Sequence, residues 1–133
     1  MQCTILIHEQ ARIIAMRKDP AQRAALYAPI GAYLEALKEA GVFVAGAGLE
    51  EPSTATVLSP AGSGWQAQDG PYADTKEQLA GYFLIDVPDR AAALAWAKRC
   101  PVLPGRTVEL CANLCRPEET QPAAHAAGMS AAR

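Results

Sequence analysis

The sequence predicts an α+β domain, in which one antiparallel sheet carries helices on a single face. Short β-prone segments and two capped helical segments follow one another in the order strand, helix, strand, strand, helix, strand. The 133 residues fit one domain, and half of them are hydrophobic, which suffices for a core without disulfides or metal.

The first strand and the first helix follow from local patterns. Residues 3–7 are apolar on both alternating faces, which predicts a strand buried on two sides. Asp19 followed by Pro20 is typical of an N-cap with proline at the first helical position, and Gly41 predicts the C-cap. Pro29 falls inside this helix, where it removes a backbone hydrogen bond, so we expect a kink or a break just before it.

The next part of the chain predicts a strand and an inserted hairpin. The strand starts at 42–44 and runs into Gly46 and Gly48, which suggest a bulge or a close approach by a backbone or a ligand. Residues 54–59 and 65–68 have strand character, and the Pro-Ala-Gly-Ser-Gly stretch between them is turn chemistry.

The second half completes the sheet. Residues 81–87 are strongly β-prone, Asp89 predicts the N-cap of a helix at 90–99, and 106–111 form a last strand. With the hairpin set aside, this order predicts a ferredoxin-like split βαβ fold. Residues 112–133 offer little to bury, so we expect a domain at 1–111 and a flexible C-terminal tail at 112–133.

Charge and leader patterns exclude some partners. Twelve basic and fourteen acidic residues give a net charge of −2, without the basic excess that nucleic-acid binding requires. The start of the chain lacks a basic segment, and its apolar run is too short for a signal peptide or a membrane span. We therefore expect a cytoplasmic protein with no nucleic-acid or membrane partner.

Cofactor and metal signatures are missing from the sequence. The four cysteines show no Cys-x-x-Cys spacing, which predicts free thiols in a reducing compartment. Cys111 and Cys115 with His125 make a poor zinc set, because a structural zinc needs four ligands held in place. No phosphate loop, dinucleotide fingerprint or nucleophile elbow is present, and we expect neither cofactor nor metal.

Residues 69–87, Asp-Gly-Pro-Tyr-Ala-Asp-Thr-Lys-Glu-Gln-Leu-Ala-Gly-Tyr-Phe-Leu-Ile-Asp-Val, closely resemble the signature of the YCII-related family in its DGPF-motif branch. Tyr72 stands where that branch usually has phenylalanine. The likeness extends to 41–42, 46–49, 93–97 and 108–109, and covers roughly residues 1–111.

The resemblance implies a dimeric α+β barrel, in which two ferredoxin-like subunits pack their open sheet faces together. The residues themselves support a homodimer, because helices on one side cannot cover a sheet whose strands are apolar on both. For function, the resemblance implies a small enzyme with a pocket near the sheet, for which a histidine–aspartate pair has been suggested. Some relatives are linked to sigma factors of the extracytoplasmic-function type, which suggests a regulatory role.

His8 and Asp69 are the first catalytic candidates. His8 ends the first strand, where it could act as a general base or be only the polar end of a strand. Asp69 precedes a Gly-Pro turn, where it is either a carboxylate base at a pocket mouth or a brace for the turn.

Four further residues complete the candidate set. Lys76 could bind an anionic substrate group and Glu77 could act as an acid or orient a base, unless the two form only a solvated charge pair. Tyr72 brings an aromatic ring to the same loop as a substrate-binding candidate. Asp86 shares a strand face with Tyr82, and is either a substrate-binding, perturbed acid or a structural anchor.

These features support two functions. One is a cofactor-independent lyase or isomerase that transfers protons on a small anionic organic molecule. The alternative is a non-catalytic metabolite-binding or regulatory module associated with an extracytoplasmic-function sigma factor system. For either function we expect the loop at 69–77 to lie over a pocket between the strand of Gly46 and Gly48 and the strand of His8.

Overall fold

The structure, a computed structural model, describes residues 1–115. Its strands are β1 (Gln2–Gln10), β2 (Phe43–Gly48), β3 (Thr56–Ala61), β4 (Gly64–Asp69), β5 (Glu77–Asp86) and β6 (Arg106–Ala112). Its helices are α1 (Ala11–Met16), α2 (Pro20–Glu39), α3 (Arg90–Arg99) and the short 3-10 helix η1 (Pro52–Thr54).

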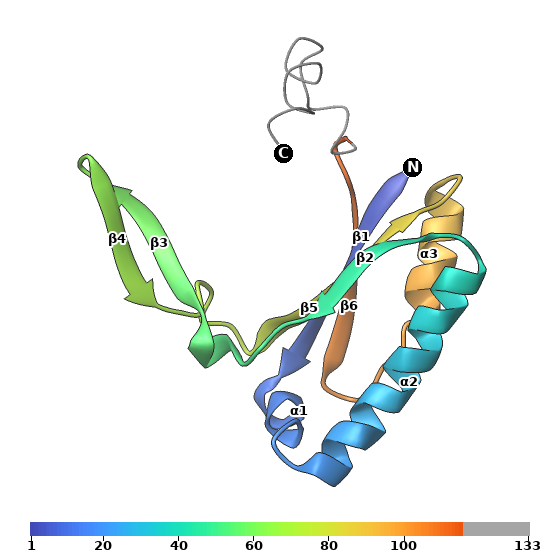
Figure 1. Cartoon of the computed structure of the whole chain (residues 1–133), viewed down its shortest axis with the longest axis horizontal. Coiled ribbons are helices and arrows are strands. Elements are labelled where there is room, and N and C mark those ends of the chain that lie inside the picture. The colour runs from blue at the N-terminus through green and yellow to red at the C-terminus, as the bar shows by residue number, and fades with distance from the viewer. Residues whose placement is uncertain (116–133) are drawn as a thin grey trace, which may run out of the picture.

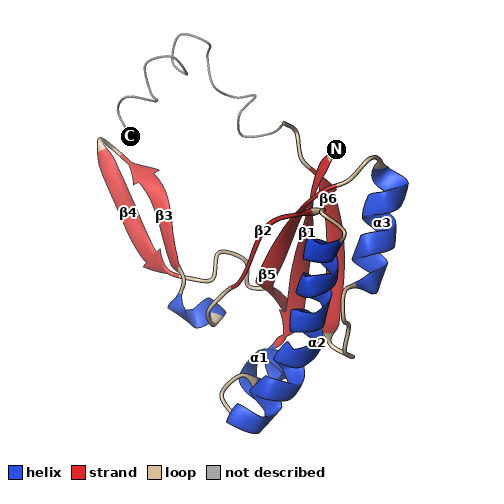
Figure 2. Cartoon of the chain, turned by 45° about the vertical axis from the view of Figure 1, so that its right-hand side comes forward, coloured by secondary structure: helices blue, strands red, loops and turns tan. Residues whose placement is uncertain are grey.

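Four strands form one antiparallel sheet in the order β2-β5-β1-β6. Helices α2 and α3 lie on the same face of this sheet, as Figures 1 and 2 show. Strands β3 and β4 pair only with each other and project from the body as a separate hairpin (Figure 1). The predicted α+β class with an antiparallel sheet is confirmed.

The core lies between the sheet and the helices. Along β1, Cys3, Ile5 and Ile7 are buried on the helix side, while the alternate residues are partly buried on the other face. Tyr33 of α2 packs edge-on against Phe83 with ring centroids 5.3 Å apart. Its hydroxyl donates to the Trp96 carbonyl oxygen at 2.7 Å, which joins α2 to α3.

The predicted helix boundaries agree with the structure, but the predicted break does not. The Asp19 side chain accepts a hydrogen bond from the Gln22 amide at 3.2 Å, and Gly41 follows α2 with φ of 73°. Helix α2 continues through Pro29 without interruption. Pro29 and Ala25 both face solvent, so water can bond the Ala25 carbonyl that the proline leaves without a donor.

Two short elements have no counterpart in the sequence prediction, α1 and η1. The hairpin and the two last elements match their predicted positions within two residues. Asn113, two residues beyond the predicted domain end, still bonds β1, because its amide donates to the Gln2 carbonyl at 2.9 Å. Of the flexible tail predicted at 112–133, residue 112 ends β6, and residues 116–133 lie outside the described residues. Within residues 1–115, no helix is both long and apolar enough to span a bilayer.

Candidate functional site

A groove at the foot of the hairpin brings together three of the six sequence candidates. The groove has a volume of about 450 Å³ on the helix-free face of the sheet, and His8, Tyr72 and Glu77 line it. His8 Nε2 lies 2.9 Å from Glu109 Oε1, and the neighbouring Thr107 hydroxyl donates to Glu77 Oε2 at 2.7 Å. The His8 and Glu109 side chains are 28% and 56% exposed, so water screens this pair.

The structure does not bring the other three candidates to the groove. Asp69 ends β4 and Lys76 precedes β5, and both are exposed. Asp86 lies at the opposite end of β5, where its Oδ1 is 3.4 Å from the amino group of Met1.

Backbone groups and one glutamine fix the loop between β4 and β5. The Gly70 amide donates to the Ala55 carbonyl at 2.7 Å. Gln78 Nε2 donates to the carbonyl oxygens of Ala73 and Thr75 at 2.9 and 2.7 Å. The loop therefore has a defined shape that depends on these groups.

We expected Gly46 and Gly48 to border the same pocket as His8, and this expectation is wrong. In register, Gly46 lies opposite Phe83 and Gly48 opposite Gly81, positions that face the helices, whereas His8 faces away from them. The alternation of side chains along a strand thus separates the two sets of residues. Gly46 and Gly48 line a different space, on the helix side.

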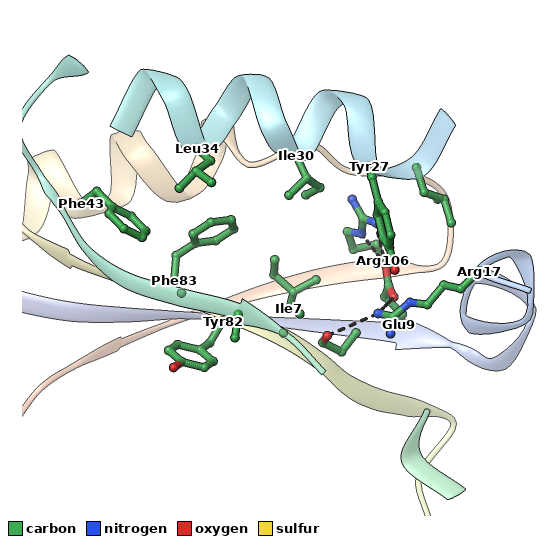
Figure 3. A pocket seen from close by; sticks show the side chains of 16 residues that line it. Ile7, Glu9, Arg17, Tyr27, Ile30, Leu34, Phe43, Tyr82, Phe83 and Arg106 are labelled. Atoms are coloured by element: carbon green, nitrogen blue, oxygen red, sulfur yellow. Dashed lines mark hydrogen bonds and ion pairs between the residues drawn. The ribbon is translucent and has the colours of Figure 1, made fainter. Parts of the chain in front are cut away.

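This second space is a cavity of about 310 Å³ between α2 and the sheet (Figure 3). The side chains of Tyr27, Ile30 and Leu34 point into it from α2, and those of Ile7 and Phe83 point into it from the sheet. Its complete lining is Ile7, Glu9, Arg17, Leu26, Tyr27, Ile30, Leu34, Phe43, Gly46, Ala47, Gly48, Ala80, Gly81, Tyr82, Phe83 and Arg106. The walls are apolar except at one end.

Glycines hollow the sheet side of the cavity. Gly46, Gly48 and Gly81 occupy positions on neighbouring strands that face α2. A Cβ atom at Gly46 would lie 3.0 Å from the Tyr82 carbonyl oxygen, and one at Gly81 would lie 2.9 Å from the Ala47 carbonyl oxygen. A Cβ at Gly48 meets no atom within 4 Å, so a side chain there would enter open space. Gly48 therefore leaves its part of the cavity open, whereas Gly46 and Gly81 allow the neighbouring strands to approach closely.

The polar end of the cavity is a buried carboxylate between two guanidinium groups. Arg17 Nη2 donates to Glu9 Oε1 at 2.8 Å. Arg106 donates to Glu9 Oε2 from Nε at 2.8 Å and from Nη2 at 2.6 Å. The side chains of Glu9, Arg106 and Arg17 are 3%, 5% and 15% exposed. We call these three residues the Glu9 cluster.

Local structure on each strand positions this cluster. Arg106 opens β6 directly opposite Glu9 of β1. Arg17 follows α1, whose buried Ile13 and Ile14 hold the helix against the sheet. The β1–β5 register shifts at Ile7, which leaves Ala80 as an extra residue. The Ala80 carbonyl accepts from Arg17 at 3.3 Å, and the Leu49 carbonyl accepts from it at 2.5 Å.

The Glu9 cluster holds two cations and one anion, and so carries a net charge of +1 in a buried place. Burial of an unbalanced charge is costly, and an anion that enters the cavity would balance it. Arg17 is the more exposed of the two arginines, and Tyr27 hangs from α2 beside the cluster (Figure 3). The cavity can therefore bind a ligand whose anionic group lies at this polar end and whose apolar body lies along the apolar walls.

Sequence reasoning missed the Glu9 cluster, although one signal was present. Buried positions alternate along β1 at Cys3, Ile5 and Ile7, and the next position in this series is Glu9. A charged residue at a buried strand position requires a partner of opposite charge. The sequence does not reveal that Arg17 and Arg106 supply it, because α1 and the register of β6 place them there.

The cysteines and possible metal ligands are also placed by the structure. Cys3, Cys100, Cys111 and Cys115 are free, as predicted. Within residues 1–115, no three His, Cys, Asp or Glu side chains gather as metal ligands would. His125, named above with Cys111 and Cys115, falls outside the described residues.

Comparison with curated proteins gives no match. Comparison with family models gives one that fits most of the chain: the YCII-related domain matches residues 1–109. This range includes β1, β2, β5 and the first part of β6, both long helices, the groove and the Glu9 cluster. The chain therefore belongs to the YCII-related family.

Proposed function

We propose that this protein binds a small organic anion with an apolar body in the cavity between α2 and the sheet. The observation that carries the proposal is the Glu9 cluster, whose buried charges sum to +1 at the end of an apolar cavity. A ligand carboxylate or similar group would balance this charge, and its hydrocarbon part would replace water along the apolar walls.

The cavity orients such a ligand. Its anionic group meets Arg17, whose Nε–H makes no hydrogen bond with the residues that the structure describes. The Tyr27 hydroxyl is a second donor on the same side. The body of the ligand lies along Ile30 and Leu34 of α2 and Phe83 of β5.

Binding is better supported in this cavity than proton transfer. Glu9 accepts three hydrogen bonds from guanidinium groups, so both of its oxygens already have donors. A general base must instead reach a proton of the substrate. The Glu9 carboxylate holds the two arginines in position and is a positioning residue in this proposal.

A second candidate function, proton transfer by a lyase or isomerase, is supported by the groove on the other face. His8 and Glu109 form a base–carboxylate pair there. Glu77 lines the same groove and accepts a hydrogen bond from the Thr107 hydroxyl. Glu109 would orient the His8 ring, as a carboxylate does beside a catalytic histidine. In this second function Asp69, Lys76 and Asp86 have no role supported by their positions.

The family resemblance and the strand order support finer assignments. We propose a ferredoxin-like split βαβ fold, because β1, α2, β2, β5, α3 and β6 follow one another along the chain and the strands lie in the order β2-β5-β1-β6 in the sheet. We also propose the DGPF-motif branch, from residues 69–72, and a homodimer joined through the open sheet faces. The cytoplasmic location and the link to a sigma factor system stay predictions.

Calorimetric titration tests the proposed function with four probes: benzoate, octanoate, and the uncharged benzyl alcohol and octanol. We expect the carboxylates to bind and the alcohols to bind at least tenfold more weakly. The Arg17→Gln variant should lower carboxylate affinity by roughly 10- to 100-fold, the range of a charge-assisted hydrogen bond. Arg90→Gln, which removes an exposed arginine from α3, is the matched control.

Two glycine variants distinguish ligand binding in the cavity from binding elsewhere on the surface. Gly48→Leu should fill the cavity and abolish binding, since a side chain there meets no other atom. Gly64→Leu makes the same change in open space on β4 and should leave binding unaltered. Equal affinity for acids and alcohols, or full binding by Gly48→Leu, contradicts the proposal.

A further inference from the structure

A recess opens directly onto the polar end of the cavity. It has a volume of about 660 Å³, and Arg17, Tyr27, Ile30 and Gly48 line both the recess and the cavity. Because the two spaces share these four residues, they are continuous. Arg17 therefore lies at the boundary between the cavity and the recess, and not at a closed end. A ligand whose anionic group meets Arg17 has room to continue outward.

The basic side chains of the recess come from the junction of α1 and α2. Arg17 and Lys18 follow α1, and Arg23 lies in the first turn of α2. Figure 3 shows the Arg17 side chain reaching the polar end of the cavity from the α1 side, near Tyr27 of α2. We call these three basic residues the cationic wall. Guanidinium and ammonium groups form charge-assisted hydrogen bonds to anions, so an anion in the recess binds most favourably at this wall.

Two cations of the wall have donors to offer. Within residues 1–115, the Arg23 guanidinium makes one hydrogen bond, from Nη1 to the Arg17 carbonyl oxygen at 3.3 Å, and has no carboxylate partner. This bond holds the Arg23 guanidinium beside Arg17 and leaves most of its five N–H donors available. Lys18 Nζ lies 3.4 Å from Glu51 Oε1, and the Lys18 side chain is 70% exposed, so water screens this pair and an anion can compete for Lys18.

The carboxylates of the recess come from a different segment, which follows β2. Glu51 has Lys18 as its partner, whereas Glu50 is exposed and makes no ion pair with any residue that the structure describes. A second negative charge on the ligand would complement Arg23, and an ammonium group would complement Glu50. The geometry favours the negative charge, because a hydrogen bond fixes Arg23 beside Arg17 and none fixes the Glu50 side chain there.

We propose that the ligand of the cavity is a phosphate monoester of an apolar alcohol, with its phosphate at the boundary between Arg17 and Arg23. The proposal rests on the binding function proposed above and names the head group of the same ligand. A phosphate monoester carries about 1.5–2 negative charges at neutral pH and three strong acceptor oxygens. It therefore reaches Arg17 on the cavity side and Arg23 on the recess side at once. The single charge of a carboxylate is already balanced by the Glu9 cluster.

Three ligands with the same octyl chain test this head group in the full chain. Octyl phosphate has the dianionic head, methyl octyl phosphate keeps the tetrahedral group with one negative charge, and octylphosphocholine adds an ammonium group to that single charge. Calorimetric titration at pH 8 keeps octyl phosphate doubly charged, since the second phosphate pKa is about 6. We expect octyl phosphate to bind at least about fivefold more tightly than the other two ligands and than octanoate.

Two variants assign the second charge to the cationic wall. Arg23→Gln should weaken octyl phosphate binding by about tenfold and leave octanoate and methyl octyl phosphate within about twofold. Glu50→Gln removes a nearby negative charge and should strengthen octyl phosphate binding by about twofold. Arg90→Gln, on α3, is the matched control and should change neither affinity. All three residues are exposed, so none of these changes threatens the folded chain.

The outcomes separate this proposal from the binding function on which it rests. A preference for octyl phosphate that Arg23→Gln removes supports the phosphate monoester. Equal affinity for octyl phosphate and its methyl ester overturns it, and so does a preference that persists in Arg23→Gln. Tightest binding of octylphosphocholine, with a loss in Glu50→Gln, also overturns it. In each of these three cases, octanoate binding that depends on Arg17 leaves the proposed function standing. If neither octanoate nor octyl phosphate binds, both proposals are wrong.

Discussion

Two neighbouring residues of β1, His8 and Glu9, show that the two faces of one sheet are different environments for a charged side chain. Glu9 faces the helices, with a side chain 3% exposed, and two arginines bond it. His8 faces the other way, with a side chain 28% exposed, and has a carboxylate partner at 2.9 Å. The hydrogen-bond distances at Glu9 and His8 are similar, but the Glu9 side chain is buried and the His8 side chain is in contact with water.

This comparison teaches that burial, and not contact distance, decides what an ion pair contributes. An exposed pair typically contributes up to about 1 kcal/mol, because water and salt screen it. Removal of one partner from a buried pair leaves an uncompensated charge and costs about 3–5 kcal/mol. An unpaired charge on the helix face of the sheet therefore costs more folding stability than one on the open face. A charged ligand can bind most selectively on the helix face for the same reason.

The largest predicted effect is on the helix face. Glu9→Gln keeps the size of the side chain and removes the negative charge between Arg17 and Arg106. We expect the free energy of unfolding to fall by about 3–5 kcal/mol, because two buried cations then lack their counter-charge. Urea denaturation followed by circular dichroism measures this change.

The matched variant on the open face is Glu109→Gln, which removes the carboxylate partner of His8. It should lower the free energy of unfolding by less than about 1 kcal/mol. If the two variants were equally stable, the contrast between the faces would be wrong. Added octanoate should stabilise the wild type more than the Arg17→Gln variant, if the cluster is the ligand site.

Much of the fold could be predicted from the sequence because its signals are local. The Asp19-Pro20 and Asp89 caps, and the glycine at 41, define helix ends within a few residues. Helix α1 lacks such signals, since its N-cap, Gln10, makes no side-chain cap bond. Its stability comes from burying Ile13 and Ile14 against the sheet, which is a tertiary effect.

The candidate site could be predicted less well, because it depends on distances along the chain. The sequence directs attention to the loop at 69–77, where ionisable residues are adjacent. Of these, Tyr72 and Glu77 reach the groove and Lys76 does not. Glu9 and Arg106 are 97 residues apart and meet through strand register alone. No local pattern encodes such a pairing.

A smaller effect should appear in the pH dependence of stability. Burial raises the pKa of the Cys100 thiol from 9.0 to about 11, against a lowering effect of Arg106. Between these values the unfolded chain loses the thiol proton before the folded chain does, so stability falls as pH rises from 9 to 11. The loss approaches about 2–3 kcal/mol at pH 11.

Denaturation curves between pH 8 and 11 measure this loss, with Cys100→Ala expected to flatten the profile. Cys111→Ala is the control on the open face, and should leave the slope unchanged. Burial also raises the pKa of the Tyr33 hydroxyl, which adds a decline of the same sign above pH 10. Tyr33→Phe isolates that part, and a Cys100→Ala profile as steep as the wild type would contradict the assignment.

The smallest predicted effect sharpens the comparison, because it depends on whether the open face stays open. Thr107→Val preserves the shape of the side chain and removes the hydroxyl that donates to Glu77 Oε2 at 2.7 Å. In a monomer water replaces that donor, so the free energy of unfolding should change by less than about 0.5 kcal/mol. If a second copy covers this face, the Glu77 carboxylate is left without a donor in a dry interface, and the cost should rise to about 1–3 kcal/mol. Unfolding of wild type and variant at one micromolar and at several hundred micromolar protein measures both values. A cost that stays small at every concentration would show that the groove remains in contact with water, even in a dimer.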